Sequence, residues 1–413
     1  MPRHARPLAA LLLGLCLALP CVAKSHHHAK PAARPAKAAP VAAPDDGVAE
    51  ARLVEVLKLV SAGHIQAAQD KVEKIVQDYP NFQLAQLVQG DLLLARTRPV
   101  NALGDVPADM ASAGSGALGG LRDESRKRLS ALTERPRAGT VPSQFLEISK
   151  TTRHAIAVDA SRSRLYVFEN RPSGLTLVAD YYTSVGKAGV SKTSQGDQRT
   201  PLGVYYITSH LEAKSLKEFY GSGALPINYP NVLDMRRGKT GGGIWLHGTP
   251  PNQFSRAPLA TDGCLVMANP DLLRVIQTVE VGSTPVVIAP QLEWVDSRTI
   301  KMASKSFEDT LIAWRNAKAD GDMNRLLSFY APDFNSYGKS LDQWAAVLKA
   351  EMNQMRGHSI ELKDASYLRW TDSADTMVVT FGEVERGKRT GWTKRQYWIQ
   401  QAGKWKIFFE GMM

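Results

Sequence analysis

The spacing of apolar residues divides the chain into three stretches. From 46 to 97 they recur at helical spacing, as at Leu53 and Val56. From about 145 to 290 short apolar runs alternate with polar turns, and from 296 to 413 helical stripes precede strand-like runs. A period near 3.6 marks a helix face and a period near two marks a strand. The pattern therefore predicts a mixed multidomain chain with a helical start, a β-rich middle and an α+β end.

The middle stretch predicts a sheet with one helix. Two apolar runs, 155–158 and 165–168, flank a polar turn and predict a hairpin. Further strands are expected at 175–182, 203–208, 244–247, 264–267 and 285–289. Asn269 is expected to cap the helix, Pro270 suits its first turn and Gly282 ends it. We expect a β-rich domain over 145–290.

The last stretch, 296–413, is expected to form a separate domain. Phe307, Leu311 and Trp314 make one helical face. Strands are expected near 359–369, 375–385, 391–401 and 404–411. Helices followed by a curved sheet resemble the cone-shaped nuclear-transport-factor (SnoaL-type) fold. That fold hosts enzymes and non-enzymes alike, so the resemblance implies an accessory binding or dimerising domain.

The N-terminal residues predict an exported protein. Arg3 and Arg6 precede an apolar run at 8–19 and a small residue ends the segment, the pattern of a secretory signal peptide over 1–23. Residues 24–45 are a basic, disordered Pro/Ala linker, whose composition cannot bury a core. We therefore expect a periplasmic protein.

The helical stretch at 46–97 resembles a tetratricopeptide unit through its small residues and Pro80. Fewer than two repeats are visible, whereas at least three are normally needed to bury a solenoid core. The segment is therefore expected to pack on a neighbouring domain or on a second copy of the chain, and a homodimer through these helices or the C-terminal domain is one interpretation. Residues 98–144 predict a Gly-rich linker and a short helix.

Composition and charge narrow the function classes. The chain has 413 residues, 44% hydrophobic and 22% charged, which excludes a disordered, collagen-like or coiled-coil protein. It has no run of 18 apolar residues, so no membrane-spanning helix is expected in the mature protein. The net charge of +11 favours an anionic partner. The charge does not choose among nucleic acid, a membrane surface and a carboxylate-rich polymer, although an exported protein rarely meets nucleic acid.

Cysteine usage points to one thiol. Cys16 and Cys21 leave with the signal peptide, so the mature chain keeps Cys264 alone. A lone cysteine in an exported protein is a buried inert residue, an intermolecular link or a reactive thiol.

The sequence around Cys264 favours the reactive thiol. His247 ends an apolar run, and Cys264 opens the next run after a Pro-containing loop. Adjacent strands joined in this way bring an imidazole and a thiol within reach. Because only a few per cent of a free thiol is ionised at neutral pH, we expect an imidazolium to hold Cys264 as a thiolate and to protonate a leaving amine. The backbone carbonyl of Gly248 is the expected partner for the other ring nitrogen.

The residues next to the cysteine suggest an oxyanion hole. Gly263 lets the backbone approach closely, so amide groups of Gly263 and Cys264 are candidates for binding a tetrahedral oxyanion. The alternatives are a core cysteine, a strand-end histidine and a glycine that serves only a tight turn.

These residues resemble the catalytic domain of the L,D-transpeptidase (YkuD-type) family. Its motif is a His-Gly pair, here His247-Gly248, followed by Ser/Thr-x-Gly-Cys, here 261–264, with Met267 and Asn269 shortly after. The stretch 199–205 matches its Thr-Pro-x-Gly strand entry. The resemblance implies a cysteine acyltransferase that attacks the third residue of peptidoglycan stem peptides, expels the terminal D-alanine and passes the acyl group to an amine. It implies no metal and no cofactor.

The match has two departures. Many family members have an arginine two residues after the cysteine, where this chain has Val266, and a frequent histidine is replaced by Asp262. The departures and the three-part layout resemble the L,D-carboxypeptidases that shape helical bacteria. A hydrolase acting on stem peptides or releasing wall-bound lipoprotein is therefore an alternative. Residues 209–240 predict a lid, with Tyr229 and Thr261 as candidate substrate contacts.

Two other classes of protein compete with this interpretation. A metalloenzyme is disfavoured because the nine histidines show no paired ligand spacing. A non-catalytic wall-binding scaffold is the alternative of a different class, because accessory segments flank the motif on both sides.

Overall fold

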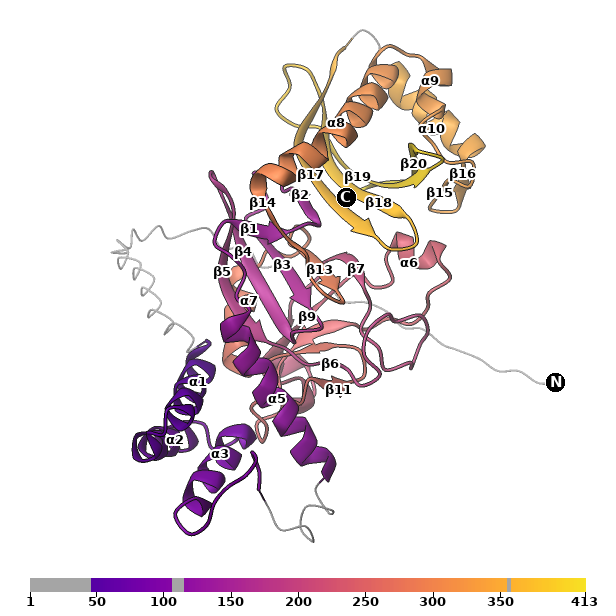
Figure 1. The fold of residues 1–413 in the computed structure, drawn as a ribbon. Coiled ribbons are helices and arrows are strands. Elements are labelled where there is room, and N and C mark those ends of the chain that lie inside the picture. The colour runs from indigo at the N-terminus through magenta and orange to yellow at the C-terminus, as the bar shows by residue number, and fades with distance from the viewer. Residues whose placement is uncertain (1–45, 106–114, 355–357) are drawn as a thin grey trace, which may run out of the picture. The chain divides into compact units, whose positions relative to one another are not determined.

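The computed structural model describes residues 46–105, 115–354 and 358–413. The predicted signal peptide and basic linker, and part of the Gly-rich linker, lie outside these residues. The N-terminal helices are α1 (Val48–Ser61), α2 (Ile65–Asp78), α3 (Gln83–Leu94) and α5 (Ser115–Thr133) (Figure 1). The longest, α5, contains the short helix expected near 121–133. The tetratricopeptide likeness stays a prediction.

The N-terminal helices share their core with a loop from the middle of the chain. Phe254 lies in the same cluster of buried residues as Val72, Phe82 and Val88. Its ring stacks on Phe82 at 4.3 Å between centroids, and its amide donates to the Asn81 carbonyl at 3.0 Å. The expected packing on a neighbouring domain is therefore observed, and its contact is the loop between His247 and Cys264.

A buried arginine on α5 reinforces this contact. Arg128 donates to Glu124 and Glu50, each at 2.8 Å, and stacks on the Tyr182 ring at 4.1 Å. Only 2% of the Arg128 side chain is exposed. Because unpaired buried charges are costly, this cluster ties α5 and α1 to the sheet that carries Tyr182.

The middle of the chain builds a five-stranded sheet in the order β5-β4-β3-β13-β7. Its strands are β3 (His154–Asp159), β4 (Arg164–Arg171), β5 (Gly174–Tyr182), β7 (Gly203–Tyr206) and β13 (Pro285–Ala289). The predicted hairpin is confirmed, since β3 and β4 pair antiparallel. Strand β13 lies between β3 and β7 and is buried along its whole length.

A second sheet carries the catalytic candidates. Its order is β12-β10-β9-β8, with β8 (Leu211–Glu212), β9 (Gly223–Pro226), β10 (Trp245–His247) and β12 (Leu265–Val266). Strands β6 (Val185–Gly186) and β11 (Leu259–Thr261) form a short parallel pair beside it. Helix α7 (Asn269–Thr278) follows β12, and Leu272 and Val275 bury its apolar face. Three short helices, η1 (Ala213–Ser215), η2 (Glu218–Tyr220) and α6 (Val232–Arg236), lie in the predicted lid segment.

The C-terminal stretch forms three helices and a curved sheet. The helices are α8 (Ser297–Ala319), α9 (Met323–Leu327) and α10 (Leu341–Gln354), with the small hairpin β15 (Asn335–Ser336) and β16 (Lys339–Ser340). The sheet strands are β17 (Ile360–Thr371), β18 (Asp375–Glu385), β19 (Trp392–Gln401) and β20 (Lys404–Met412). Figure 1 shows α8 lying along this sheet, where Phe307 packs edge-on against Trp398. The α+β prediction is confirmed.

Strand β2 (Phe145–Glu147) joins this C-terminal sheet by pairing with β17. It stands at the start of the stretch expected to form the middle domain. Strands β1 (Thr140–Pro142) and β14 (Trp294–Asp296) also pair, so both ends of the middle domain are joined to each other next to α8. These long-range pairings tie the two domains together through the backbone.

Side chains from α6 add a second link to the C-terminal domain. Arg237 forms a bidentate ion pair with Asp372, and Arg236 pairs with Asp333. Arg395 stacks on the Tyr206 ring at 3.5 Å. Helix α6 begins with a capping box between Asn231 and its third residue. The segment preceding the glycines at 241–243 is therefore anchored to the C-terminal domain.

We expect Arg128→Ala to destabilise the protein by about 3–5 kcal/mol, because it leaves the buried Glu124 without its cation and removes one of the two arginines, Arg128 and Arg164, that bind Glu50. The measurement is the urea midpoint of the first unfolding transition. Arg126→Ala on the same helix is the matched control, because that side chain is 75% exposed, and it should shift the midpoint little. Equal shifts for the two variants would show that the buried cluster does not hold the helices in place.

Candidate active site

The pairing of two short strands brings the predicted histidine and cysteine to one face of a sheet. Strand β10 runs parallel to β12, with Leu246 opposite Leu265. Both leucines are fully buried in the core. Because side chains alternate between faces along a strand, His247 and Cys264, each one residue from a leucine, lie on the opposite face. Both line the same pocket.

This pocket has a volume of about 210 Å³. It lies between the glycine segment 241–243, the short helix η2 and the residues around Cys264. Two buried cations, Lys192 and Arg256, also line it. The cysteine side chain is partly exposed, whereas His247 is 2% exposed. The site is thus a small pocket in which the thiol is partly accessible to solvent and the imidazole is buried.

The imidazole of His247 is held by its neighbour. Its Nδ1 lies 2.7 Å from the carbonyl oxygen of Gly248, the contact expected from the sequence. A carbonyl oxygen only accepts, so Nδ1 carries the proton in the neutral ring and Nε2 keeps its lone pair. Tyr220 lies edge-on to the ring at 5.0 Å between centroids. The geometry presets Nε2 as a proton acceptor.

Burial changes the protonation expected for the pair. Burial lowers the pKa of His247 to about 4, opposed by its bond to Gly248, and the nearby charge of Arg256 lowers it further. Burial also raises the pKa of the Cys264 thiol above its usual value. Both shifts favour the neutral forms at neutral pH. These directions differ from the resting thiolate–imidazolium pair expected from the sequence, which stays a prediction.

Several groups nonetheless stabilise a thiolate once it forms. The backbone amide of Trp245 faces the sulfur and opposes the rise in the pKa of Cys264, as do the charges of Arg256 and Lys192, whereas Asp262 adds to it. In the neutral state Sγ donates to the Gly243 carbonyl oxygen at 3.5 Å. The site can therefore support nucleophilic attack by the Cys264 sulfur on a carbonyl carbon, with His247 as the general base that takes the thiol proton.

The turn before the cysteine is tied by threonine hydroxyls. The Gly263 amide donates to Thr261 Oγ1 at 3.1 Å, and that hydroxyl donates to the Cys264 carbonyl at 2.7 Å. Thr200 Oγ1 donates to the Gly263 carbonyl at 3.0 Å. A Cβ at Gly263, where φ is +124°, would lie 2.7 Å from the Arg199 carbonyl oxygen. The position therefore requires glycine.

This turn corrects the predicted oxyanion hole. The Gly263 amide is occupied by Thr261 and is not a free donor. The Cys264 amide donates to no acceptor in the described part of the chain. Of the two predicted donors, the Cys264 amide is the one left to bind an oxyanion.

The two predicted substrate contacts have other partners. Tyr229 is 5% exposed, packs edge-on against Tyr205, and donates to the Thr240 carbonyl at 3.1 Å. It lies in the core and does not line the pocket. Thr261 lines the pocket, but its hydroxyl is committed to the turn. Tyr229 is therefore a packing residue and Thr261 a turn residue.

Asn269 was predicted to cap α7 but is its first residue, with Ala268 at the cap. Its side-chain oxygen accepts from the amides of Ser222 and Thr249, and its nitrogen donates to the Thr249 carbonyl at 2.8 Å. The amide thus clamps the loop after His247 to the segment after η2. A cap would have needed a free side-chain oxygen facing the helix.

Two features of the site were not singled out from the sequence. In the predicted lid, η2 reaches the pocket through Phe219 and Tyr220. The second is Arg256. It is the only lysine or arginine between His247 and Cys264 in the sequence, and this could have marked it as a candidate site residue.

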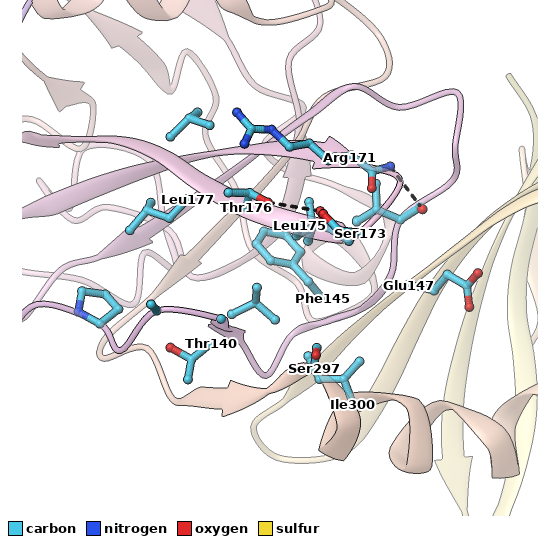
Figure 2. A pocket seen from close by; sticks show the side chains of 18 of the residues that line it. Thr140, Phe145, Glu147, Arg171, Ser173, Leu175, Thr176, Leu177, Ser297 and Ile300 are labelled. Atoms are coloured by element: carbon cyan, nitrogen blue, oxygen red, sulfur yellow. Dashed lines mark hydrogen bonds between the residues drawn. The ribbon is translucent and has the colours of Figure 1, made fainter.

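A larger cavity lies elsewhere in the described part of the chain. It has a volume of about 1220 Å³ and shares no residue with the Cys264 pocket. Figure 2 shows it beside the edge strand β5, with Phe145, Leu175 and Ile300 on its walls. Its lining residues include no cysteine and no histidine, so its size alone does not make it the reactive site.

Residues 46–105, 115–354 and 358–413 contain no cluster of three or more histidine, cysteine or acidic side chains able to hold a metal ion. Within the same ranges no helix is long and apolar enough to cross a bilayer.

Comparison with known families assigns two parts of the chain. Residues 153–288 match the family model of the L,D-transpeptidase catalytic domain (YkuD). Residues 306–411 match that of the Cds6 C-terminal NTF2-like domain. The resemblances seen in the sequence are thus confirmed for both domains. No curated protein sequence matches the chain.

Solved structures share the fold over about two thirds of this chain. Bd1075 from Bdellovibrio bacteriovorus aligns with a TM-score of 0.56 at 24% identity, over 66% of this chain and 98% of that one. The helical cell shape determining protein Pgp2 from Campylobacter jejuni aligns with a TM-score of 0.52 at 23% identity, over 65% and 95%. The fold of the larger part of this chain therefore recurs in other proteins.

We expect the alkylation rate of Cys264 by iodoacetamide to rise only at alkaline pH, above the range of an ordinary thiol. The reason is that burial raises the pKa of Cys264, while His247, with a pKa of about 4, is neutral at neutral pH. The measurement is the label on the Cys264 peptide, followed by mass spectrometry across pH. A rate plateau extending into acidic pH that His247→Gln abolishes would instead show a resting ion pair.

Proposed function

We propose that this chain, whose residues 153–288 form a catalytic domain of the L,D-transpeptidase family, is a cysteine acyltransferase acting on peptidoglycan stem tetrapeptides. The observation that carries the proposal is the placement of His247 and Cys264 on one sheet face, in one pocket, with Nδ1 of the histidine fixed by Gly248. That arrangement leaves Nε2 to accept the thiol proton.

The reaction follows from these groups. His247 Nε2 takes the proton of Cys264 as Sγ bonds to the carbonyl carbon of the third stem residue. The oxyanion that forms accepts a hydrogen bond from the Cys264 amide. One such donor lowers the activation free energy by about 3 kcal/mol. As the tetrahedral adduct collapses, the carbon–nitrogen bond breaks and the imidazolium returns its proton to the leaving D-alanine amine. The acyl group then remains on sulfur.

An amine acceptor completes the transfer by the reverse steps. Its nitrogen attacks the thioester carbonyl, His247 takes a proton from it, and the sulfur leaves and is reprotonated. The acceptor proposed is the free amine of a second stem peptide, which gives a cross-link. A wall-bound lipoprotein is a further proposed partner of the same chemistry.

Water as the acceptor is a second candidate, favoured by the size of the site. At about 210 Å³ the pocket is below the usual 300–1,000 Å³ range of small-molecule sites. It suits a small leaving group and a small nucleophile better than a second peptide. The enzyme would then be an L,D-carboxypeptidase that shortens tetrapeptides to tripeptides.

The proposed location is outside the cytoplasm, where peptidoglycan lies. The formal net charge of +11 is consistent with a polymer partner found there, because stem peptides carry several carboxylates that a basic protein attracts. We propose the periplasm as the compartment, reached through the predicted signal peptide.

The test is incubation of the full chain with a disaccharide tetrapeptide and mass analysis of the products. We expect loss of D-alanine from the tetrapeptide, with dimers for transfer or tripeptide alone for hydrolysis. Cys264→Ala should abolish turnover. His247→Gln should lower kcat by about 10²- to 10⁴-fold, because it removes the general base.

Tyr229→Phe is the matched control, because its hydroxyl lies in the core away from the pocket, and it should keep near-normal turnover. If the protein is a non-catalytic wall-binding scaffold, the unaltered chain should bind peptidoglycan sacculi without forming product. Cys264→Ala should then bind the sacculi as tightly as the unaltered chain. That combined result would refute the enzymatic proposal.

A further inference from the structure

The Cys264 pocket contains a buried cation without a partner. Arg256 is 9% exposed and lines the pocket together with Cys264 and His247. In the described part of the chain its guanidinium makes no hydrogen bond and no ion pair, and its contact is the Phe219 ring at 4.4 Å. The other buried cation of the pocket, Lys192, is bound to Asp197 at 2.7 Å and to the Ser194 carbonyl at 2.9 Å.

A buried guanidinium without an anion is unfavourable. Removing a charge from water carries a desolvation cost that a partner normally offsets. A guanidinium also presents a fork of N–H donors that matches a carboxylate with two parallel hydrogen bonds. Because Lys192 is already neutralised by Asp197, Arg256 is the cation of this pocket that is available to a ligand anion.

The position of Arg256 is fixed by its neighbours. Ser255 Oγ donates to Glu124 on α5 at 2.7 Å, and Phe254 stacks on Phe82 of the N-terminal helices. The Arg256 carbonyl accepts from the Tyr182 hydroxyl at 2.8 Å. The N-terminal helices therefore hold the loop that carries the guanidinium, which preorganises it for binding.

The charge lies close to the reacting atoms. Arg256 lowers the pKa of both His247 and Cys264 through space. In a stem tetrapeptide the carboxylate nearest the scissile bond is that of the leaving residue, whose carboxyl carbon is two bonds from the departing nitrogen. An anion bound beside both catalytic groups is best supplied by that carboxylate.

We propose that Arg256 binds the free C-terminal carboxylate of the leaving D-amino acid and so restricts the enzyme to stem peptides that end at that residue. The proposal rests on the proposed function. Val266, which stands where an arginine is frequent in the family, is 1% exposed and offers no charge. Arg256 supplies a cation from the loop on the other side of the cysteine.

The test compares two substrates of equal length, a tetrapeptide with a C-terminal carboxylate and the same peptide as its C-terminal amide. We expect the unaltered enzyme to prefer the acid by about 100-fold in kcat/KM, the scale of a charge-assisted pair. Arg256→Gln should bring the two substrates within a few-fold of each other by reducing turnover of the acid alone. Arg256→Lys should restore part of the preference, because it keeps the charge but loses the fork.

The control is Arg274→Gln, which removes an equal charge from an exposed position on α7 outside the pocket and should keep the preference. Thermal melting of each variant verifies that it is folded. An Arg256→Gln enzyme that loses activity equally on both peptides would show a merely electrostatic or structural role. One that keeps the preference would exclude carboxylate binding.

A second measurement separates this proposal from the proposed function. Cys264 is alkylated with anionic iodoacetate and with neutral iodoacetamide, and the label is located on its peptide by mass spectrometry. We expect the ratio of the two rates to fall about tenfold in Arg256→Gln, because the anion loses its nearby cation. An unchanged ratio would overturn the anion site. A changed ratio in an enzyme that cleaves neither peptide would refute the peptide function and retain the anion site.

Discussion

The site depends on the parallel register between β10 and β12. Leu246 lies opposite Leu265 in the core, so His247 and Cys264 are both directed to the other face. A shift of one residue in either strand would move that strand's catalytic side chain into the core and expose a leucine. The burial of these two leucines therefore stabilises the fold and also selects the only pairing in which thiol and imidazole share a pocket.

Burial has two opposed effects on this chemistry. It keeps His247 neutral, with its pKa lowered to about 4, which makes the ring a proton acceptor at neutral pH. It also raises the pKa of Cys264 and disfavours a free thiolate. Both shifts favour a neutral thiol and a neutral imidazole, so attack by the sulfur requires a base such as Nε2 to take the thiol proton.

The sequence predicted what local spacing controls. Most strands and helices were found near their expected bounds, and His247, Gly248 and Cys264 lie where the motif placed them. The Gly263 amide was misassigned because a neighbouring hydroxyl, Thr261 Oγ1, competes for it. The addition of β2 to the C-terminal sheet depends on contacts far apart in the chain, which periodicity does not report.

The two flanking domains meet the active site through different loops. The N-terminal helices hold the loop at 249–258 through Phe254 and Ser255, and that loop carries Arg256 to one side of the pocket.

The C-terminal domain holds α6 through the Arg237–Asp372 pair. Helix α6 leads into the glycine segment whose Gly243 carbonyl faces the sulfur. Since glycine-rich backbone has little rigidity of its own, its anchoring by the C-terminal domain gives that domain a structural part in positioning the thiol. The flanking domains therefore contact two different segments that line one pocket, the loop that carries Arg256 and the glycine segment 241–243.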